Sequence, residues 1–333
     1  MTQQNNLVLA QQHIDAMLDA KTSITILLAG RTGVGKSSTI NSLLGTQVAP
    51  VGKFRPTTIS VARYPHEHGG LHYDIVDTPG LCDDLPEVGN DQRYLAAIRE
   101  ASAQADCLLF ITELDATRVS SDERRGIQML TEALGASVWE NALLVFTRAD
   151  KVEAKEFEAD FKERTGLLRE TIAAYAPLHA AYIPALAVSN TSEKLPNGKP
   201  WLSELFTQVL TRLRHDATVP FLHSMRKDVG IDPSAQQTGA EAPAAADPAA
   251  SDTAADKPAA GATTTEPGRA KPRIDLDPEQ QERVKKTVWD RILKGVTTGA
   301  AVGAKIGKVF GKRGEAIGAA IGAVGGALLG WLL

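Results

Sequence analysis

The chain has few cysteines, few aromatic residues and little net charge. Its two cysteines, Cys82 and Cys107, cannot form a disulfide framework, and the N-terminal sequence MTQQNNLVLAQQ lacks a basic start followed by an apolar run. We therefore expect a protein that is not secreted through a cleaved signal and that works in a reducing compartment. A net charge of −4 over 333 residues does not favour a nucleic-acid-binding protein. Hydrophobic residues still make up 43%, which excludes a wholly disordered or collagen-like chain.

The small net charge hides an uneven distribution. Residues 273–333 carry ten Lys and Arg against six Asp and Glu, which leaves 26 basic and 34 acidic residues, a net charge of −8, in the rest of the chain. A basic end beside an acidic body favours a negatively charged partner surface, and membrane lipid is the leading candidate.

Apolar, strand-like segments alternate with helix-like segments over most of the N-terminal two thirds. Near-continuous apolar strands separated by periodic helices predict an α/β fold with a doubly wound, mostly parallel sheet that is covered on both faces. We assign residues 21–228 to this domain and residues 1–20 to a preceding helix. The strand-like segments read SITILLAG, LHYDIVDTP, CLLFITEL, NALLVFTRA and AYIPALAVS.

The composition changes after this domain. Residues 231–272 contain 14 Ala and 6 Pro and no aromatic residue. They cannot bury enough apolar surface to fold, so we assign residues 229–272 to a disordered linker that would let the domain move away from an anchor. We assign residues 273–333 to an amphipathic helix, which Asp277 caps and Pro278 begins, followed by a glycine repeat.

Glycines recur every fourth residue in two runs near the C-terminus. Because four residues are close to one helical turn, each run forms a stripe along which two helices can approach closely. Residues 316–333 contain no charge over 18 residues, the lower limit for a membrane span. The repeat predicts a helical glycine-zipper hairpin in a membrane, and a soluble hairpin or an interfacial helix is the alternative. The glycines stand at 295, 299, 303, 307 and 311, and at 314, 318, 322, 326 and 330.

Residues 30–37 read GRTGVGKS, a complete GxxxxGK[ST] phosphate-binding motif between a strand-like and a helix-like segment. Backbone N–H groups of such a loop surround phosphate oxygens, Lys36 reaches the β and γ phosphates, and the Ser37 hydroxyl ligates Mg²⁺. The predicted nucleotide-binding residues of this loop are Gly30, Arg31, Thr32, Gly33, Val34, Gly35, Lys36, Ser37 and Ser38.

Two further segments predict a nucleotide switch. Asp77 in DTPG can hold Mg²⁺ through water, and the Gly80 N–H can sense the γ-phosphate. In FRPTTIS, Thr57 or Thr58 should reach Mg²⁺ and the γ-phosphate, and we prefer Thr58. We therefore predict Ser37, Thr58 and Asp77 as metal ligands, and Lys36, Thr58 and Gly80 as catalytic residues.

The base is predicted to lie against TRAD, residues 147–150. Asp150 can accept hydrogen bonds from guanine N1 and N2, and adenine offers no such donor pair, so GTP and GDP are favoured over ATP. Thr147 belongs to this motif, and Arg148 can stack over the base. Asn190 would lie against the other side of the base, or it is an ordinary turn residue.

With these motifs, the chain resembles the paraseptin branch of GTPases, which includes the chloroplast protein-import (Toc) receptors and the immune-associated nucleotide-binding proteins. The resemblance covers about residues 21–215. It implies homodimerisation across the nucleotide face, with Arg118 presented to the partner's phosphates, although Arg118 could instead pair with a surface acid or cap a strand. Leu81 stands where Ras-like proteins carry a water-orienting glutamine, which implies slow hydrolysis. The matching stretches are GRTGVGKSSTINSLLG, VDTPGLCD, ELDATRV, VWENALLVFTRAD and LPNGKPW.

The sequence as a whole predicts a membrane-associated switch GTPase whose GTPase domain faces the cytoplasm, with GTP or GDP and Mg²⁺ as cofactors. The expected partners are membrane lipid, a second copy of the chain and an unknown protein effector, but no nucleic acid. Two alternatives remain open. One is a GTP-gated membrane scaffold, and the other is a membrane-active effector in which the glycine hairpin is the working part.

Overall fold

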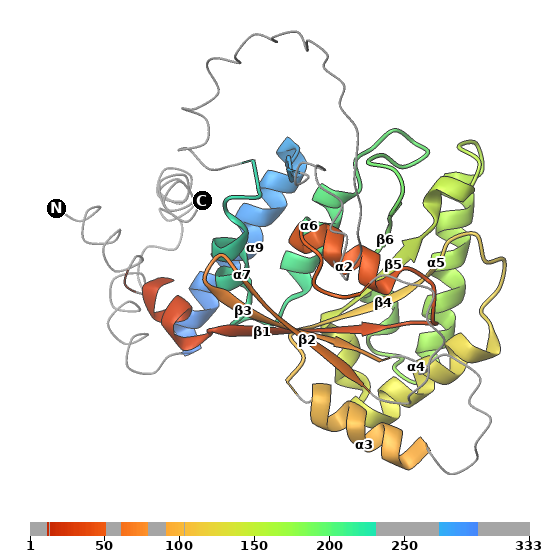
Figure 1. The fold of residues 1–333 in the computed structure, drawn as a ribbon, viewed down its shortest axis with the longest axis horizontal. Helices are drawn as coiled ribbons and strands as arrows, with labels where there is room; N and C mark the ends of the chain where they lie inside the picture. Colours follow the sequence, from red (N-terminus) through yellow and green to blue (C-terminus); the bar gives the residue numbers. More distant parts are fainter. Residues whose placement is uncertain are drawn as a thin grey trace, which may run out of the picture.

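The computed structural model describes residues 12, 14–50, 61–78, 91–102, 104–230 and 273–298. A six-stranded sheet with the strand order β2-β3-β1-β4-β5-β6 forms its centre (Figure 1). All neighbouring strands are parallel except β2 and β3, which form an antiparallel hairpin. The predicted mostly parallel, doubly wound sheet is thereby confirmed. The strands are β1 (Ser23–Ala29), β2 (Ala62–His68), β3 (Leu71–Asp77), β4 (Cys107–Glu113), β5 (Ala142–Thr147) and β6 (Ala185–Ala187).

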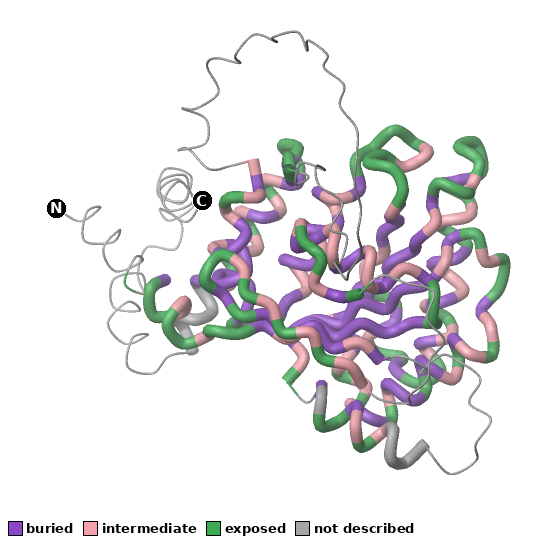
Figure 2. The backbone as a smooth tube through the Cα atoms, viewed as in Figure 1, coloured by how far each residue is buried: buried purple, intermediate pink, exposed green. Residues whose placement is uncertain are grey.

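Helices cover both faces of this sheet. One hydrophobic core lies between the sheet and α2, α6, α7 and α9, and a second lies between the sheet and α3, α4 and α5. The central strands β1, β4 and β5 are largely buried (Figure 2). The helices are α2 (Lys36–Leu44), α3 (Asp91–Ser102), α4 (Ser121–Leu134), α5 (Phe157–Ala173), α6 (Leu202–Arg212), α7 (Thr218–Met225) and α9 (Pro278–Thr298), with 3₁₀ turns η1 (Ala136–Asn141), η2 (Ala149–Lys151) and η3 (Ala180–Tyr182).

The central strands differ from the edge strand in the way their side chains are buried. All six residues of β5 are buried, as are the first six of β4, because helices cover both faces there. Strand β2 alternates between half-buried and exposed residues and contains Pro65, which an edge strand tolerates. The parallel strands β1, β4 and β5 end at one edge of the sheet, where ligands of such folds bind.

Helix α9 completes the folded domain, which corrects the boundary expected after residue 228. Its buried residues Val284, Val288 and Ile292 join the core that α6 and α7 form with the sheet. The apolar stripe of this amphipathic helix is therefore covered by protein, and the segment before it does not separate it from the domain. The helix starts as expected, because Asp277 Oδ1 accepts a hydrogen bond from the Gln280 N–H at 2.8 Å.

A β-bridge joins the two ends of the Ala- and Pro-rich segment. The Ile274 N–H donates to Asp228 O at 2.8 Å, and the Gly230 N–H donates to Ile274 O at 2.8 Å. The described chain therefore ends at Gly230 and resumes at Arg273 at one place on the domain. A protein truncated at residue 228 would lose α9 and expose the apolar side chains beneath it.

Several predicted features lie outside the described residues. They are residues 1–11 of the N-terminal helix, Thr58, Gly80, Leu81, residues 231–272 of the linker and the glycine repeat beyond residue 298. Residues 14–20 are helical, in agreement with the expected helix before β1. Within the described ranges, no helix combines the length and the apolar character needed to cross a membrane.

Candidate functional site

The phosphate-binding motif forms the loop between β1 and α2. Gly30, Gly33 and Gly35 all have positive φ angles, of 144°, 83° and 99°. A Cβ atom at Gly30 would lie 2.0 Å from Ile111 O, so only glycine allows the loop to cross β4 this closely. A Cβ atom at Gly33 would meet open space. The loop leads directly into α2, whose N-terminal end favours negative charge.

Lys36 and Asp77 meet beneath this loop. The Lys36 side chain is 6% exposed, and its Nζ donates to Gly30 O at 2.8 Å and to Arg31 O at 3.1 Å. Asp77 ends β3, and its Oδ1 lies 3.7 Å from Lys36 Nζ. A buried ammonium needs such partners, and here they hold it where the motif requires a phosphate ligand. Ser37 is half-buried in the first turn of α2. Its hydroxyl and the Asp77 carboxylate are oxygen ligands of the kind that fit Mg²⁺.

The remaining residues of the loop have different surroundings. Arg31 and Thr32 are exposed, and Ser38 is half-buried in α2. Arg31 Nε lies 3.4 Å from Asp122 Oδ2 at the start of α4. This ion pair connects the outer side of the phosphate loop with the segment that follows β4.

Thr147 and Arg148 connect the base motif to the phosphate loop. Thr147 Oγ1, at the end of β5, donates to Val34 O at 2.6 Å. Arg148 adopts a left-handed φ of 59°, and its guanidinium lies 2.6 Å from Glu113 Oε1 and donates to Gly33 O at 3.4 Å. The planar group of Arg148 is thereby held beside the loop. Glu113, the last residue of β4, is not among the predicted site residues.

Asp150 is held by Ser189, which is likewise not among the predicted site residues. The Ser189 hydroxyl donates to Asp150 Oδ1 at 2.8 Å, from the segment that follows β6. Partial burial acts to raise the pKa of Asp150, but hydrogen bonds from Ser189 and Thr191 outweigh it and lower the pKa below its ordinary value. The carboxylate is therefore charged at neutral pH and can act as a double hydrogen-bond acceptor. Ser189 immediately precedes Asn190 in the sequence, but only the pairing of β5 with β6 brings it to Asp150.

Asn190 contacts the end of the phosphate loop and the first turn of α2. Its Nδ2 lies 3.5 Å from Gly35 O and 3.3 Å from Thr39 Oγ1. A Cβ atom at Gly35 would approach this Nδ2 to 2.8 Å. The side chain is thus directed towards α2 instead of the position expected for the second face of the base, because it fills the space that Gly35 leaves.

Arg118 lies on a loop between β4 and α4 that is fixed at the start of α4. Ser120 and Glu123 form a capping box at the start of α4, and the Glu123 carboxylate also pairs with the buried Arg164. Arg118 is exposed, and it forms no hydrogen bond or ion pair with any residue that the structure describes. The alternative role of pairing with a surface acid is thus not seen, and the arginine points from a firmly held loop towards solvent.

Comparisons with known proteins match this arrangement. The AIG1 family model matches residues 24–177, and the YMGG-like Gly-zipper model matches residues 281–332. Translocase of chloroplast 33 from Arabidopsis thaliana is 31% identical over 211 residues, which cover 58% of this chain and 71% of that protein. Translocase of chloroplast 34 from the same plant is 32% identical over 209 residues, which cover 56% and 64%. A crystal structure of a dimerisation-deficient mutant of Arabidopsis Toc33 covers 60% of this chain and 90% of its own, with 27% identity and a TM-score of 0.50.

Proposed function

Because the chain belongs to the AIG1 family, with the chloroplast translocase GTPases among its relatives, we propose that it is a membrane-tethered switch GTPase that works as a dimer. It is a GTP hydrolase with guanine nucleotide and Mg²⁺ as cofactors. One observation on the residues of this chain supports the proposed function most directly. The Lys36–Asp77 pair and the Ser189–Asp150 pair lie at the same sheet edge. Thr147, at the start of the base motif, donates a hydrogen bond to Val34 O in the phosphate loop and so joins the two parts of the site.

The nucleotide preference follows from Asp150. Its carboxylate accepts two hydrogen bonds from guanine, whereas adenine presents an acceptor at N1 and no amino group at C2. We therefore expect GTP to displace a fluorescent GDP analogue from the Mg²⁺-loaded full-length protein, and an excess of ATP to leave it bound. The full chain is the right material because α9 is part of the core. Equal competition by ATP would refute the guanine assignment.

Hydrolysis by a single copy is proposed to be slow, and dimerisation to accelerate it. Two observations support this proposal. The apolar side chain of Leu81 cannot orient a water molecule, and Arg118 is exposed on a loop that the Ser120–Glu123 capping box fixes at the start of α4. An arginine presented to the phosphates of the other copy would stabilise the charge that develops in the transition state.

Replacing Arg118 with Ala is expected to reduce dimer formation in the presence of a non-hydrolysable GTP analogue. At high protein concentration it should lower GTP turnover at least about tenfold, because arginines supplied in trans contribute much to phosphoryl transfer. Sedimentation and turnover measured over a range of protein concentrations test both effects. Arg273→Ala is the matched control, since the one ion pair of this exposed arginine with a described residue is with Asp275 before α9. Unchanged concentration dependence in Arg118→Ala would argue against the trans role.

The membrane tether is proposed to be the glycine repeat that follows α9. The match of residues 281–332 to a Gly-zipper family and the uncharged stretch 316–333 support it. Flotation of the full-length protein with lipid vesicles, with and without residues 299–333, tests this part of the proposal. A protein that floats equally well without the repeat would contradict it.

A further inference from the structure

Helix α9 runs beside α6 in the same direction and brings the chain to the amino-terminal edge of the sheet (Figure 1). Near the start of both helices, Gln280 Nε2 and Arg283 bind Glu204 at 3.1 and 2.9 Å. Near their ends, the Arg291 guanidinium reaches Leu213 O at 3.4 Å. The chain therefore enters this pair of helices near one edge of the sheet and leaves it at the other.

The edge that α9 reaches lies opposite the nucleotide site. The Arg214 N–H donates to Asp106 O, immediately before β4, so α6 ends where the parallel strands begin. Helix α9 continues to Thr298, seven residues past Arg291, which is about 10 Å of helix. The glycine repeat follows directly in the sequence. A membrane segment that begins there would bring this edge to the lipid surface and leave the phosphate loop on the far side.

The amino-terminal edge has the side chains that such a position requires. Leu178 is 81% exposed and Tyr182 is 78% exposed, both just before β6. Arg169 and Arg212 donate to the neighbouring carbonyl groups of Ile183 and Tyr182, so these two arginines lie close together. Exposed apolar side chains among clustered arginines suit the interface of an anionic membrane.

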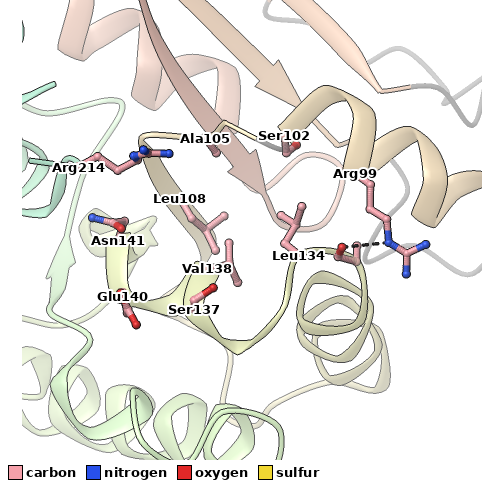
Figure 3. A pocket seen from close by; sticks show the side chains of 11 residues that line it. Arg99, Ser102, Ala105, Leu108, Leu134, Ser137, Val138, Glu140, Asn141 and Arg214 are labelled. Atoms are coloured by element: carbon pink, nitrogen blue, oxygen red, sulfur yellow. Dashed lines mark hydrogen bonds between the residues drawn. The ribbon is translucent and has the colours of Figure 1, made fainter. Parts of the chain in front are cut away.

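A cavity of about 470 Å³ opens at the same edge, between α3, α4, η1 and the start of β4 (Figure 3). Leu108, Leu134 and Val138 form its apolar wall. Ser102 also lines the cavity, and its side chain is almost fully buried. Its hydroxyl has no hydrogen-bond partner among the described residues. An unpaired buried hydroxyl in a cavity of this size suits a polar ligand group.

Two arginines, Arg99 and Arg214, and one carboxylate, that of Glu140, line this cavity. Arg99 donates to Ala133 O at 3.0 Å and to Glu132 O at 3.1 Å, which fixes its guanidinium at the end of α4. Arg214 is 48% exposed, and its Nε forms ion pairs with Asp216 at 3.7 Å and with Asp106 at 3.9 Å, both beyond hydrogen-bond distance. Its two Nη groups have no such partner among the described residues and are available for a ligand. Guanidinium donors beside a hydroxyl are well suited to phosphate oxygens.

We propose that the amino-terminal edge faces the membrane and that the cavity between Arg214 and Ser102 binds the phosphate of an anionic phospholipid headgroup. The inference rests on the membrane tether proposed above, and it adds a fixed orientation and a lipid site. Because α9 is docked on the domain, the anchor holds the GTPase domain with its nucleotide edge directed away from the bilayer, where a second copy can reach it.

The orientation is tested with the full-length protein in vesicles that contain headgroup-spin-labelled lipid. In a Cys82→Ser background, a fluorophore is placed at Ser137→Cys on the cavity rim or at Lys155→Cys, which is exposed after β5 at the opposite edge. Cys107 is fully buried and stays unlabelled. We expect the lipid to quench the label at position 137 more strongly than the label at position 155. Equal or reversed quenching in protein that floats with the vesicles would overturn the orientation, whereas protein that does not float would refute the tether itself.

The headgroup site is tested with the same label at position 137. Quenching should be stronger in vesicles that contain phosphatidylglycerol than in phosphatidylcholine alone, and Arg214→Gln should lose this difference. Arg63→Gln is the matched control, because Arg63 is a half-exposed arginine on the edge strand β2. GDP binding and the thermal unfolding midpoint verify that each variant is folded. The proposal fails if Arg214→Gln keeps the difference, or if inorganic phosphate abolishes it in the wild type and so identifies a free anion as the ligand.

Discussion

Replacing Asp150 with Asn is expected to weaken GDP and GTP binding by roughly a hundred- to a thousandfold. The carboxylate accepts hydrogen bonds from guanine N1 and N2, and each hydrogen bond to a charged group contributes about 1.5–3 kcal/mol. A loss of about 3–4 kcal/mol corresponds to roughly two to three orders of magnitude in the dissociation constant. In addition, the Asn amide directs an N–H donor at the guanine amino group, itself a donor. Displacement of fluorescent GDP from the full-length protein measures the change.

A xanthine nucleotide serves as the control that separates lost recognition from lost folding. Xanthine has a carbonyl at C2, so the side-chain amide that Asp150→Asn introduces can donate to that oxygen and accept from N1. Xanthosine diphosphate should therefore bind the variant better than the wild type, with the Ser189 hydroxyl still holding the amide oxygen. Unchanged GDP affinity in the variant would show that Asp150 does not read the base.

The phosphate end of the site could be predicted from the sequence because its chemistry is local. Gly30, Lys36 and Ser37 belong to one continuous motif, and the apolar run before it and the periodic segment after it predict the strand and the helix that hold it. The Lys36–Asp77 contact also follows from the order of motifs, because β1 and β3 are parallel neighbours and end at the same edge.

The contacts that join segments distant in sequence could not be predicted in the same way. Ser189 holds Asp150, and Glu113 pairs with Arg148, through side chains that are 39 and 35 residues apart. Ser and Glu at strand ends are common, so their types alone do not identify a partner. These pairs become recognisable only after the order of β4, β5 and β6 in the sheet is known.

Helix α9 shows a second kind of ambiguity. The spacing of Val284, Val288 and Ile292 predicts an apolar stripe, but a stripe does not tell whether protein or lipid covers it. The sequence therefore left the partner of the stripe open, and the structure places the stripe on α6 and α7. The Arg283–Glu204 pair beside the stripe is the kind of specific polar contact that a lipid surface would not provide.

Replacing Lys36 with Ala is expected to lower GTP hydrolysis by roughly a hundred- to a thousandfold. This is the usual effect of removing one hydrogen-bond donor that stabilises the charge of a transition state. GTP binding should weaken more than GDP binding, because the ammonium reaches the γ-phosphate that GDP lacks. Turnover measured at saturating GTP and displacement of fluorescent GDP test the two effects separately. Lys155→Ala is the matched control, since this lysine is 73% exposed and pairs only with acids on its own segment. Lys36 donates to Gly30 O and Arg31 O, so the thermal unfolding midpoint must be compared as well. A variant that stays folded and keeps wild-type turnover would exclude Lys36 from the chemistry, whereas one that loses turnover with GDP affinity largely retained places its charge on the γ-phosphate.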